Sequence, residues 1–499
     1  MSGNMTMDRL YRYVPMIAVF ASLIGLAACS VGPDYKGPPH IAPKAEKAKA
    51  FHRALSSQVS NQTPVSFWWT QLNDPLLTEL IQTALQNNPD VKSGAARLRT
   101  ARAVINEHFA SMFPGGGAGA MWMRTQIPLG DVTSVLGGSS EAPQSVALPT
   151  KVVSESYAAG FDASWEIDPF GGNRRGLESA KAQSEAQLAQ IADTEVQVAA
   201  EVARNYISLR GVQNRLALTQ TSVDIEQRML RLTQQRRKEG TASDEDVERF
   251  QVQFLQTQAS LSPLRTEEAH DLDAIAVLVG MEPGELDPRL SVVKPVLMPP
   301  AQVQVGDPAS MIRRRPDIRV AERNIVAMNA EIGQVIGQYF PKISLFGTVG
   351  FTSANGRRFI SGDNFSYMGG PTLEWSILNS ARINARVGQA KGERDAAIAH
   401  YQNVVLAALQ DAETSLARFS HQRDYVMKIQ GAKASADRSW LLAQQRHAAG
   451  TLSVIDALDV ERQRNLLEQE EAQAITDMTV DYVALQKSLG LGWELSATP

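Results

Sequence analysis

Residue types that carry enzyme and metal chemistry occur in this sequence, but not at the spacings that such chemistry needs. The seven histidines are scattered along the chain without metal-ligand spacing. They are His40, His52, His108, His270, His400, His421 and His447. The sequence contains neither a phosphate-binding P-loop nor a nucleophile elbow. We therefore expect no enzyme activity, no cofactor and no metal site.

The single cysteine, Cys29, lies where an export signal ends. Arg9 and Arg12 precede an apolar stretch over residues 14–28, which ends in Leu-Ala-Ala and is too short to span a bilayer comfortably. A cysteine directly after Leu-Ala-Ala resembles the bacterial lipobox. This resemblance implies a diacylated thiol, cleavage before Cys29 and an acylated amine, because stable anchoring needs more than one acyl chain. The alternative is an ordinary signal peptide with a buried free cysteine, which the position of Cys29 disfavours.

The residue after the cysteine and the overall composition narrow the class of protein. In lipoproteins similar to this one, aspartate after the cysteine favours retention in the inner membrane, so Ser30 implies the outer membrane. Hydrophobic residues make up 43% of the chain and its formal net charge is −4, which disfavours disorder and nucleic-acid binding. A single cysteine excludes an intramolecular disulfide. After residue 28 no run of eighteen apolar residues follows.

Internal similarity shows that one unit of about 210 residues is duplicated. At an offset of 227, Asn88-Pro89-Asp90 matches Arg315-Pro316-Asp317, and Phe113-Pro114 matches Phe340-Pro341. At an offset of 210, Trp165 matches Trp375, Gln234-Gln235-Arg236 matches Gln444-Gln445-Arg446, and Gly240-Thr241 matches Gly450-Thr451. The change from 227 to 210 places 17 extra residues between Pro114 and Trp165, in a Gly- and Ser-rich loop.

The repeats define a domain plan. Residues 1–28 form the signal peptide, and the Pro-, Ala- and Lys-rich residues 29–66 form a lipidated tether. Repeat 1 covers residues 67–285, a linker covers 286–306, repeat 2 covers 307–490, and a tail covers 491–499. Each repeat is predicted to contain a helix, two strands, a long helix, a turn and a returning helix.

Capping signals and periodicity locate these elements. Asp74-Pro75 and Asp307-Pro308 open helices that run to about residues 109 and 339. Long helices over about 174–238 and 381–446, the first with a heptad seam, turn at 239–241 and 449–451 and return over 243–278 and 453–489. Period-two strands lie around 118–128, 156–167, 343–351 and 367–377. In the weakest strand, 118–128, Met121, Met123 and Ile127 lie opposite Arg124 and Gln126.

The strand pattern fits either a transmembrane sheet or a half-buried soluble sheet, and the export signal favours the membrane. Four strands cannot close into a barrel, and an open edge in lipid would leave backbone groups unsatisfied. Either the strands lie outside the membrane or several chains share one barrel. Three chains would supply twelve strands and would close the helical layer as well.

The duplicated plan, the Phe-Pro before each first strand and the sequence Ser-Trp-Glu-Ile-Asp-Pro-Phe-Gly at 164–171 resemble the TolC-like outer membrane efflux proteins. The lipobox and Val-Gly-Pro-Asp-Tyr at 31–35 resemble the lipoprotein branch of that family, in RND-type efflux systems. The resemblance covers the chain from Cys29 almost to its end. The sequence departs from the family at Gly171-Gly172 and at Ala381-Arg382, where Gly-Arg is usual.

The resemblance implies an α+β membrane protein. Its homotrimer would form a twelve-stranded barrel in the outer membrane and a periplasmic helical barrel. The implied function is the outlet duct of a tripartite system that exports drugs or other small molecules, with a periplasmic adaptor and an inner-membrane RND-type pump as partners. Two alternatives stay open: an outlet for type I protein secretion, and a non-conducting trimeric lipoprotein scaffold in the outer membrane.

Seven further positions become candidate site residues through the resemblance. Ile455, Asp459 and Arg462 match family positions that constrict the periplasmic mouth, where an aspartate ring would attract cations. Without the resemblance, Asp459 and Arg462 form an ordinary surface pair one helical turn apart. Gly240, Thr241, Gly450 and Thr451 are first of all turn residues. Their position at the helix tips also predicts contacts with the adaptor.

Overall fold

A computed structural model describes residues 30–54, 58–128 and 151–494. Cys29, the signal peptide and the whole loop at 129–150 lie outside the described residues. The chain divides into two compact units. Unit 1 comprises Met1–Lys36, Ala101–Gln183 and Val326–Ala396, and unit 2 comprises Gly37–Thr100, Ser184–Ile325 and Ala397–Pro499. Across the described part of the chain, no helix combines the length and apolarity needed to cross a membrane.

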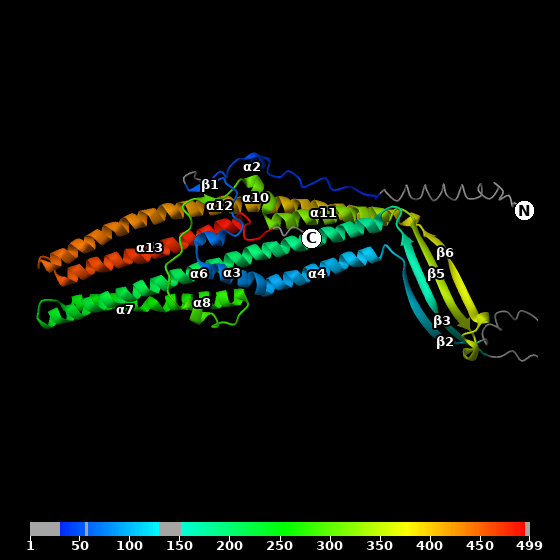
Figure 1. Cartoon of the computed structure of the whole chain (residues 1–499), viewed down its shortest axis with the longest axis horizontal. Coiled ribbons are helices and arrows are strands. Elements are labelled where there is room, and N and C mark those ends of the chain that lie inside the picture. Colours follow the sequence, from blue (N-terminus) through cyan, green and yellow to red (C-terminus); the bar gives the residue numbers. More distant parts are fainter. Residues whose placement is uncertain (1–29, 55–57, 129–150, 495–499) are drawn as a thin grey trace, which may run out of the picture. The chain divides into compact units, whose positions relative to one another are not determined.

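Unit 1 contains a four-stranded antiparallel sheet in the order β2-β3-β5-β6. The strands are β2 (Gly115–Pro128), β3 (Lys151–Ile167), β5 (Lys342–Ser353) and β6 (Phe365–Glu374) (Figure 1). Short 3₁₀ turns, η2 (Gly356–Arg358) and η3 (Gly362–Asn364), connect β5 to β6. Each repeat therefore supplies two neighbouring strands, as the sequence predicts.

The register gives the sheet one apolar face. Phe161 pairs with Ala118 on one side and Val349 on the other, and Val349 pairs with Tyr367. Phe161 and Tyr367 are 67% and 82% exposed within the single chain. Large apolar side chains so exposed require a lipid or protein environment, because such patches rarely face water.

In β2, the methionines lie on the face opposite Arg124 and Gln126, as the sequence predicts. Trp122 pairs with Tyr157, so it is the even-numbered residues of β2, Arg124 and Gln126 included, that continue the face of Phe161. Met123 pairs with Ser156 and lies on the opposite, more polar face. Small residues at the start of β2 had hidden this alternation, because alanine and glycine give almost no hydropathy contrast.

Two tryptophans confirm that the repeats fold alike in unit 1. Trp165 donates its indole N–H to the carbonyl of Met112 at 2.9 Å, and Trp375 donates to the carbonyl of Tyr339 at 3.0 Å. Each bond ties the end of a strand to the residues just before the first strand of the same repeat. β6 ends at Glu374, and η4 (Ile377–Asn379) follows it, so the strand is shorter than its apolar pattern predicts.

The opening helix of each repeat is broken by a proline. Repeat 1 has α3 (Pro75–Asn87) and α4 (Pro89–Ala110), and repeat 2 has α10 (Pro308–Arg314) and α11 (Pro316–Gly337). The single helices expected over 74–109 and 307–339 are therefore wrong in this respect. Residues before proline are disfavoured in helical conformation. Asn88 and Arg315 accordingly have ψ angles of 131° and 125°.

Long helices dominate the rest of the chain. They are α6 (Gly172–Lys238), α7 (Asp244–Ala259), α8 (Leu261–Val279), α12 (Ser380–Ala448) and α13 (Val454–Ser488). The return helix of repeat 1 breaks at Ser260, whereas α13 is continuous. Pro263 explains the difference, because it lacks the N–H that would bond to the carbonyl of Ala259. The matching position in repeat 2 is Gln473.

In unit 2 the end of each return helix docks on the proline break of its repeat. Asn88 donates its side-chain amide to the carbonyl of Leu278 at 2.9 Å. Arg315 donates to the carbonyl of Ser488, the residue that matches Leu278, at 2.5 Å. At each break, a polar side chain thus donates to a carbonyl at the end of the return helix, where carbonyls lack partners within the helix.

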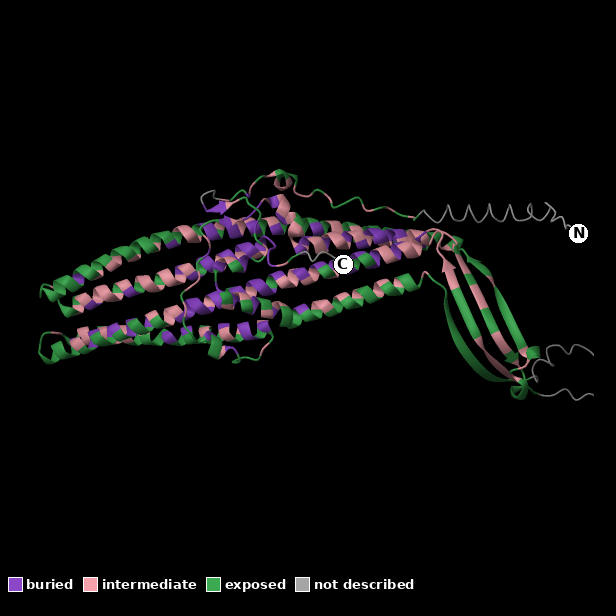
Figure 2. Cartoon of the chain, viewed as in Figure 1, coloured by how far each residue is buried: buried purple, intermediate pink, exposed green. Residues whose placement is uncertain are grey.

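The core of unit 2 lies along the middle of α6, where buried residues are densest (Figure 2). Trp68 of η1 (Trp68–Leu72), Tyr206 and Tyr482 are almost fully buried there. Residues 30–66 include α2 (Pro43–Lys47) and β1 (Val59–Ser60), which pairs in parallel with β4 (Val303–Gln304) of the inter-repeat linker. The linker also contains α9 (Asp287–Leu290).

Candidate gate, helix tips and N-terminal junction

The structure brings Asp459 and Arg462 of α13 together. One carboxylate oxygen of Asp459 accepts hydrogen bonds from Arg462 Nη2 at 2.8 Å and Nε at 3.1 Å. The other oxygen accepts from Gln463 at 2.9 Å. Within one chain, both oxygens of Asp459 are therefore occupied by its own helix, as in the surface pair considered as the alternative to a gate.

Ile455 is placed apart from this pair, in a small apolar cluster. It packs, partly buried, against Ile225 and Met229 of α6 and Leu458 of its own helix. Phe250 of α7 packs against the same cluster. Ile455 thus helps to hold the start of α13 to both helices of the first hairpin.

A buried polar ladder beside this cluster was not found from the sequence. Asn465 donates its amide to the carbonyl of Leu218 at 2.8 Å and to Ser222 Oγ at 2.6 Å. Gln469 donates to the same Ser222 hydroxyl at 3.0 Å. Asn465 and Ser222 are only 3% and 1% exposed. The signal in the sequence was weak, because polar residues recur on all faces of these helices.

Glu226 is a second residue that the sequence did not reveal. It is 5% exposed, and one of its carboxylate oxygens has no hydrogen-bond partner among the described residues. Burial raises the pKa of the Glu226 carboxyl, while hydrogen bonds with Thr257 and Gln253 and the charge of Arg462 lower it. The charge of Arg462 therefore interacts with two carboxyl groups, that of Asp459 on its own helix and that of Glu226 on α6.

The two helix tips have the same backbone geometry. Gly240 and Gly450 adopt φ angles of +74° and +72°, the left-handed conformation that favours glycine. Thr241 donates its backbone N–H to Arg236 at 2.8 Å, and Thr451 donates to Arg446 at 2.9 Å. The structure places all four predicted tip residues in exposed turns.

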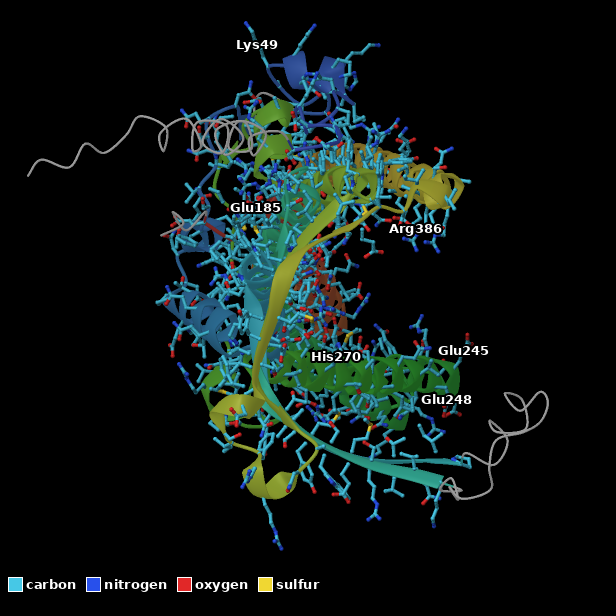
Figure 3. All side chains as sticks on the ribbon, turned by 90° about the vertical axis from the view of Figure 1, so that its right-hand side faces the viewer. Lys49, Glu185, Glu245, Glu248, His270 and Arg386 are labelled. Carbon is cyan, nitrogen blue, oxygen red and sulfur yellow. The ribbon has the colours of Figure 1, made fainter. Side chains whose placement is uncertain are left out.

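The helices that leave the tips are capped alike and carry exposed charge. Ser243 and Ser453 each accept a hydrogen bond from the backbone N–H of the aspartate three residues later. Figure 3 shows the side chains of Glu245 and Glu248, both exposed, on α7 just after the first turn. At the second turn, an open groove of about 530 Å³ between α12 and α13 is lined by residues such as Leu442 and Leu452.

The described chain begins beside Cys29 at the junction between β3 and α6. Val31 donates its backbone N–H to the carbonyl of Phe170 at 3.0 Å. Gly171, the half of the expected Gly-Arg that this sequence keeps, has a φ of +79°. A side chain on Gly171 would also collide with Ser30, because a Cβ there would lie 2.9 Å from the Ser30 Cα.

Among the residues that the structure describes, no group of three or more His, Cys, Asp or Glu side chains could hold a metal ion. The polar residues near the tips and the junction instead form hydrogen bonds with one another and with backbone.

Comparison with known proteins identifies close structural and sequence similarity. The family model described as "Outer membrane efflux protein" matches residues 80–281 and 308–491, one stretch in each repeat. Outer membrane protein OprJ of Pseudomonas aeruginosa is 28% identical over 484 residues, covering 96% of this chain and 97% of that protein. Nodulation protein T of Rhizobium leguminosarum bv. trifolii is 26% identical, covering 97% and 98%.

Solved structures agree with these relatives. The outer-membrane channel OprN is 31% identical with a TM-score of 0.80, covering 93% of this chain and 100% of that structure. The Campylobacter jejuni CmeC outer membrane channel has a TM-score of 0.81 at 19% identity, covering 94% and 96%, and supports the fold alone.

Proposed function

This chain belongs to the outer membrane efflux protein family, and from that premise we propose that three copies of it form the outlet duct of a tripartite drug-efflux system. The chain is an outer membrane efflux channel with a TolC-like α+β fold. The finer proposal adds the homotrimer, a periplasmic adaptor and an inner-membrane RND-type pump as partners. It also assigns drugs or other small organic molecules as cargo.

The observation that carries the trimer is the open four-stranded sheet. Among the described residues, β2 and β6 each have a strand neighbour on one side only, and the apolar face of the sheet is exposed in the single chain. An unpaired strand edge in lipid is strongly unfavourable. If β6 of one chain pairs with β2 of the next, three chains give a closed ring of twelve strands with no free edge.

The names of relatives support small apolar cargo. A similar protein of Pseudomonas putida is named as the outer membrane protein of a toluene efflux pump, and another as that of an antibiotic efflux pump. They are 27% and 28% identical to this chain, which covers 99% and 95% of their lengths. For this chain, we propose organic solvents and drugs as the cargo class.

We also propose that Cys29 carries acyl chains and that the protein is thereby lipid-anchored in the outer membrane. The lipobox sequence supports this. The docked position of Ser30 and Val31 at the strand-to-helix junction adds support, because an acyl group one residue earlier would start from that junction.

Gating and adaptor contact complete the proposal. We assign Ile455, Asp459 and Arg462 to the periplasmic gate, and Gly240, Thr241, Gly450 and Thr451 to adaptor contacts. Arg462 supports the gate assignment, because it stands between Asp459 and the buried Glu226 and could exchange one acid partner for another.

A deletion strain and planar bilayers test the function together. Deletion should increase susceptibility to apolar drugs, and complementation should restore resistance. Purified trimers should give discrete conductance steps in a planar bilayer. Conductance without any change in susceptibility, but with loss of a secreted protein, would favour protein secretion. Absence of conductance from intact trimers would favour the scaffold instead.

A further inference from the structure

The first described residues, Ser30–Asp34, form a segment that is docked against unit 1, and we call this segment the N-terminal strap. Its Val31 bonds to the carbonyl of Phe170 in the turn between β3 and α6. Arg175 of α6 donates from Nε to the carbonyl of Val31 at 3.0 Å. Asn329 of α11 donates to the carbonyl of Pro33 at 2.8 Å. The strap thus contacts three separate elements of the same unit.

Arg175 is the main polar contact of the strap. Its side chain is only 5% exposed, although it carries a permanent charge. It forms ion pairs with Asp34 of the strap at 2.6 Å and with Glu178 of its own helix at 2.7 Å. Burial lowers the pKa of the Arg175 guanidinium, but hydrogen bonds with both carboxylates more than compensate and raise it. A buried guanidinium without such partners would be costly, so strap and Arg175 stabilise each other.

Two glycines allow the strap backbone to approach α11 closely. Gly32 has a φ of +97°, and a Cβ added there would lie 2.4 Å from the Cα of Gly333. A Cβ added to Gly333 would lie 2.8 Å from the carbonyl oxygen of Val31. Neither distance is tolerated between real atoms, and backbone atoms cannot move aside as a side chain can. Both positions therefore require glycine while the strap is docked.

The duplication provides an internal comparison, because the contact residues of the strap occur in one copy only. In repeat 2 the residue that matches Arg175 is Ala385. In α4 of repeat 1 the residues that match Asn329 and Gly333 are Arg102 and Asn106. General folding of a repeat therefore does not need these residues, which are present only where the single N-terminal segment lies.

We propose that Arg175, Asn329 and Gly333 form an intrachain receptor for the N-terminal strap, which fixes the mature N-terminus at the strand-to-helix junction independently of any lipid. The chemistry recognised is a Val-Gly-Pro-Asp peptide with a left-handed glycine and a carboxylate. Only the consequence for acyl placement rests on the proposed lipidation of Cys29. If that lipidation occurs, the receptor sets where the acyl chains enter the membrane relative to β3.

Hydrogen exchange on the purified full-length protein in detergent tests the receptor. Gly32→Ala, which leaves the receptor and all helices unaltered, should increase exchange in residues 30–36 by about tenfold or more, as local opening becomes easier. Gly37→Ala is the matched control, because Gly37 has a similar φ of +109° but no atom within 4 Å of the added Cβ. Equal exchange in the Gly32 and Gly37 variants would overturn the proposal.

A second pair of variants alters the receptor side. Gly333→Ala should release residues 30–36, whereas Gly388→Ala, a helical glycine with open space around it, should not. Arg175→Met should likewise increase exchange both in residues 30–36 and in the Phe170 turn, and Arg386→Met, an exposed arginine of α12, is its control. Unchanged protection of residues 30–36 in both receptor variants would exclude the receptor.

Non-acylated protein separates this inference from the lipidation proposal. With Cys29→Ser and a substitute signal peptide, residues 30–36 should stay protected. Fast exchange there in the Ser variant alone would mean that the lipid, not the receptor, holds the segment, and the proposal would fail. An intact mass without acyl chains on the wild-type protein would instead refute lipidation and leave the receptor standing.

Discussion

At the scale of single residues, a buried aspartate and its half-buried counterpart at the matching position of the other repeat have different surroundings. Asp271 of α8 is 3% exposed, and one of its carboxylate oxygens has no hydrogen-bond partner within the described chain. It faces Ser208 on α6, whereas its counterpart Asp481 faces Arg418, the residue that matches Ser208. The position that supplies an arginine to Asp481 in repeat 2 thus supplies only a hydroxyl to Asp271 in repeat 1.

This difference predicts a pH dependence of stability. Burial raises the pKa of Asp271 from 3.8 to about 6, with the charge of nearby Glu267 adding to it, and Ser208, His270 and Arg204 opposing it. The pKa of Asp271 is higher in the folded state than in the unfolded state. The free energy of unfolding therefore falls as pH rises from about 4 to about 6, and the contribution of Asp271 stays constant above that range. The penalty is at most about 3 kcal/mol.

At pH values above 6, Asp271→Asn should therefore raise the midpoint temperature of unfolding. Between pH 4 and 6, the midpoint of this variant should depend less on pH than that of the wild type. Circular dichroism melts across that range measure both effects. Asp481→Asn is the matched comparison and should stabilise less, because burial also raises the pKa of Asp481 but the charge of Arg418 opposes that shift. The assignment would be contradicted if the difference in midpoint temperature between the wild type and the Asp271 variant were the same at pH 4.5 and pH 7.

The proposed gate gives a second prediction at this scale. Asp459→Ala removes the acceptor that Arg462 and Gln463 share, so the closed mouth should loosen and single-channel conductance should rise. Glu461→Ala, on the same turn of α13, is the control. Planar-bilayer recordings measure the change, and an unchanged closed conductance in Asp459→Ala would count against the gate.

At the scale of elements, the sequence predicted the order of helices and strands but not their breaks. The helical spacing of apolar residues continues across Asn88 and Ser260, where the helices end. This spacing therefore cannot show that the backbone hydrogen bonds of the helix are interrupted there. The prolines next to these positions carried that information. The receptor for the strap and the contact of Asp271 with Ser208 could not be predicted, because their partners are distant in sequence and follow no period.

The glycines of the two tips lead to a prediction about turn geometry. Gly240→Ala and Gly450→Ala should each cost about 1–2 kcal/mol, because alanine is strained at these positive φ angles while the space around both is open. Asparagine should be tolerated better. Gly431→Ala, within α12 and also unobstructed, should instead be slightly stabilising. Chemical unfolding measures the stability of each variant, and adaptor capture, measured in parallel, reports the contact between the tips and the adaptor. Equal stability of all variants would refute the strain argument.

The inter-repeat linker gives the second prediction about an element. Arg210 is fully buried and donates to the carbonyls of Leu290 and Val292 at 2.9 Å and 2.8 Å. Arg210→Met should remove the Arg210 donor from the Val292 carbonyl and leave the Leu290 carbonyl with its bond from Gln213 alone. We expect unit 2 to be destabilised by about 3 kcal/mol. Proteolysis within residues 286–306 should quicken as well. Arg204→Met, a half-exposed arginine on the same helix, is the control, and comparable resistance of the two variants would contradict the role of Arg210.

At the scale of the whole molecule, the proposed ring of strands and the lipid are separate anchors. Once three chains close their sheets, acyl chains add little to retention in the membrane. Cys29→Ser with a substitute signal peptide should therefore impair sorting or assembly more than the conductance of the trimers that form. Membrane fractionation, cross-linking and bilayer recording measure the three quantities. Trimers that assemble normally but conduct nothing would reverse this ranking.

The strap receptor occurs once in each chain, whereas the turn at the helix tips occurs twice, and this has a consequence for symmetry. The proposed trimer would present three receptors but six similar turns. A partner that contacts the turns would therefore meet two sets of three that are not equivalent. Only small differences distinguish them, such as the Arg237–Asp244 ion pair at one tip and the His447 contact with the Leu452 carbonyl at the other. A partner that distinguishes the two turns of a chain would therefore have to contact these side chains.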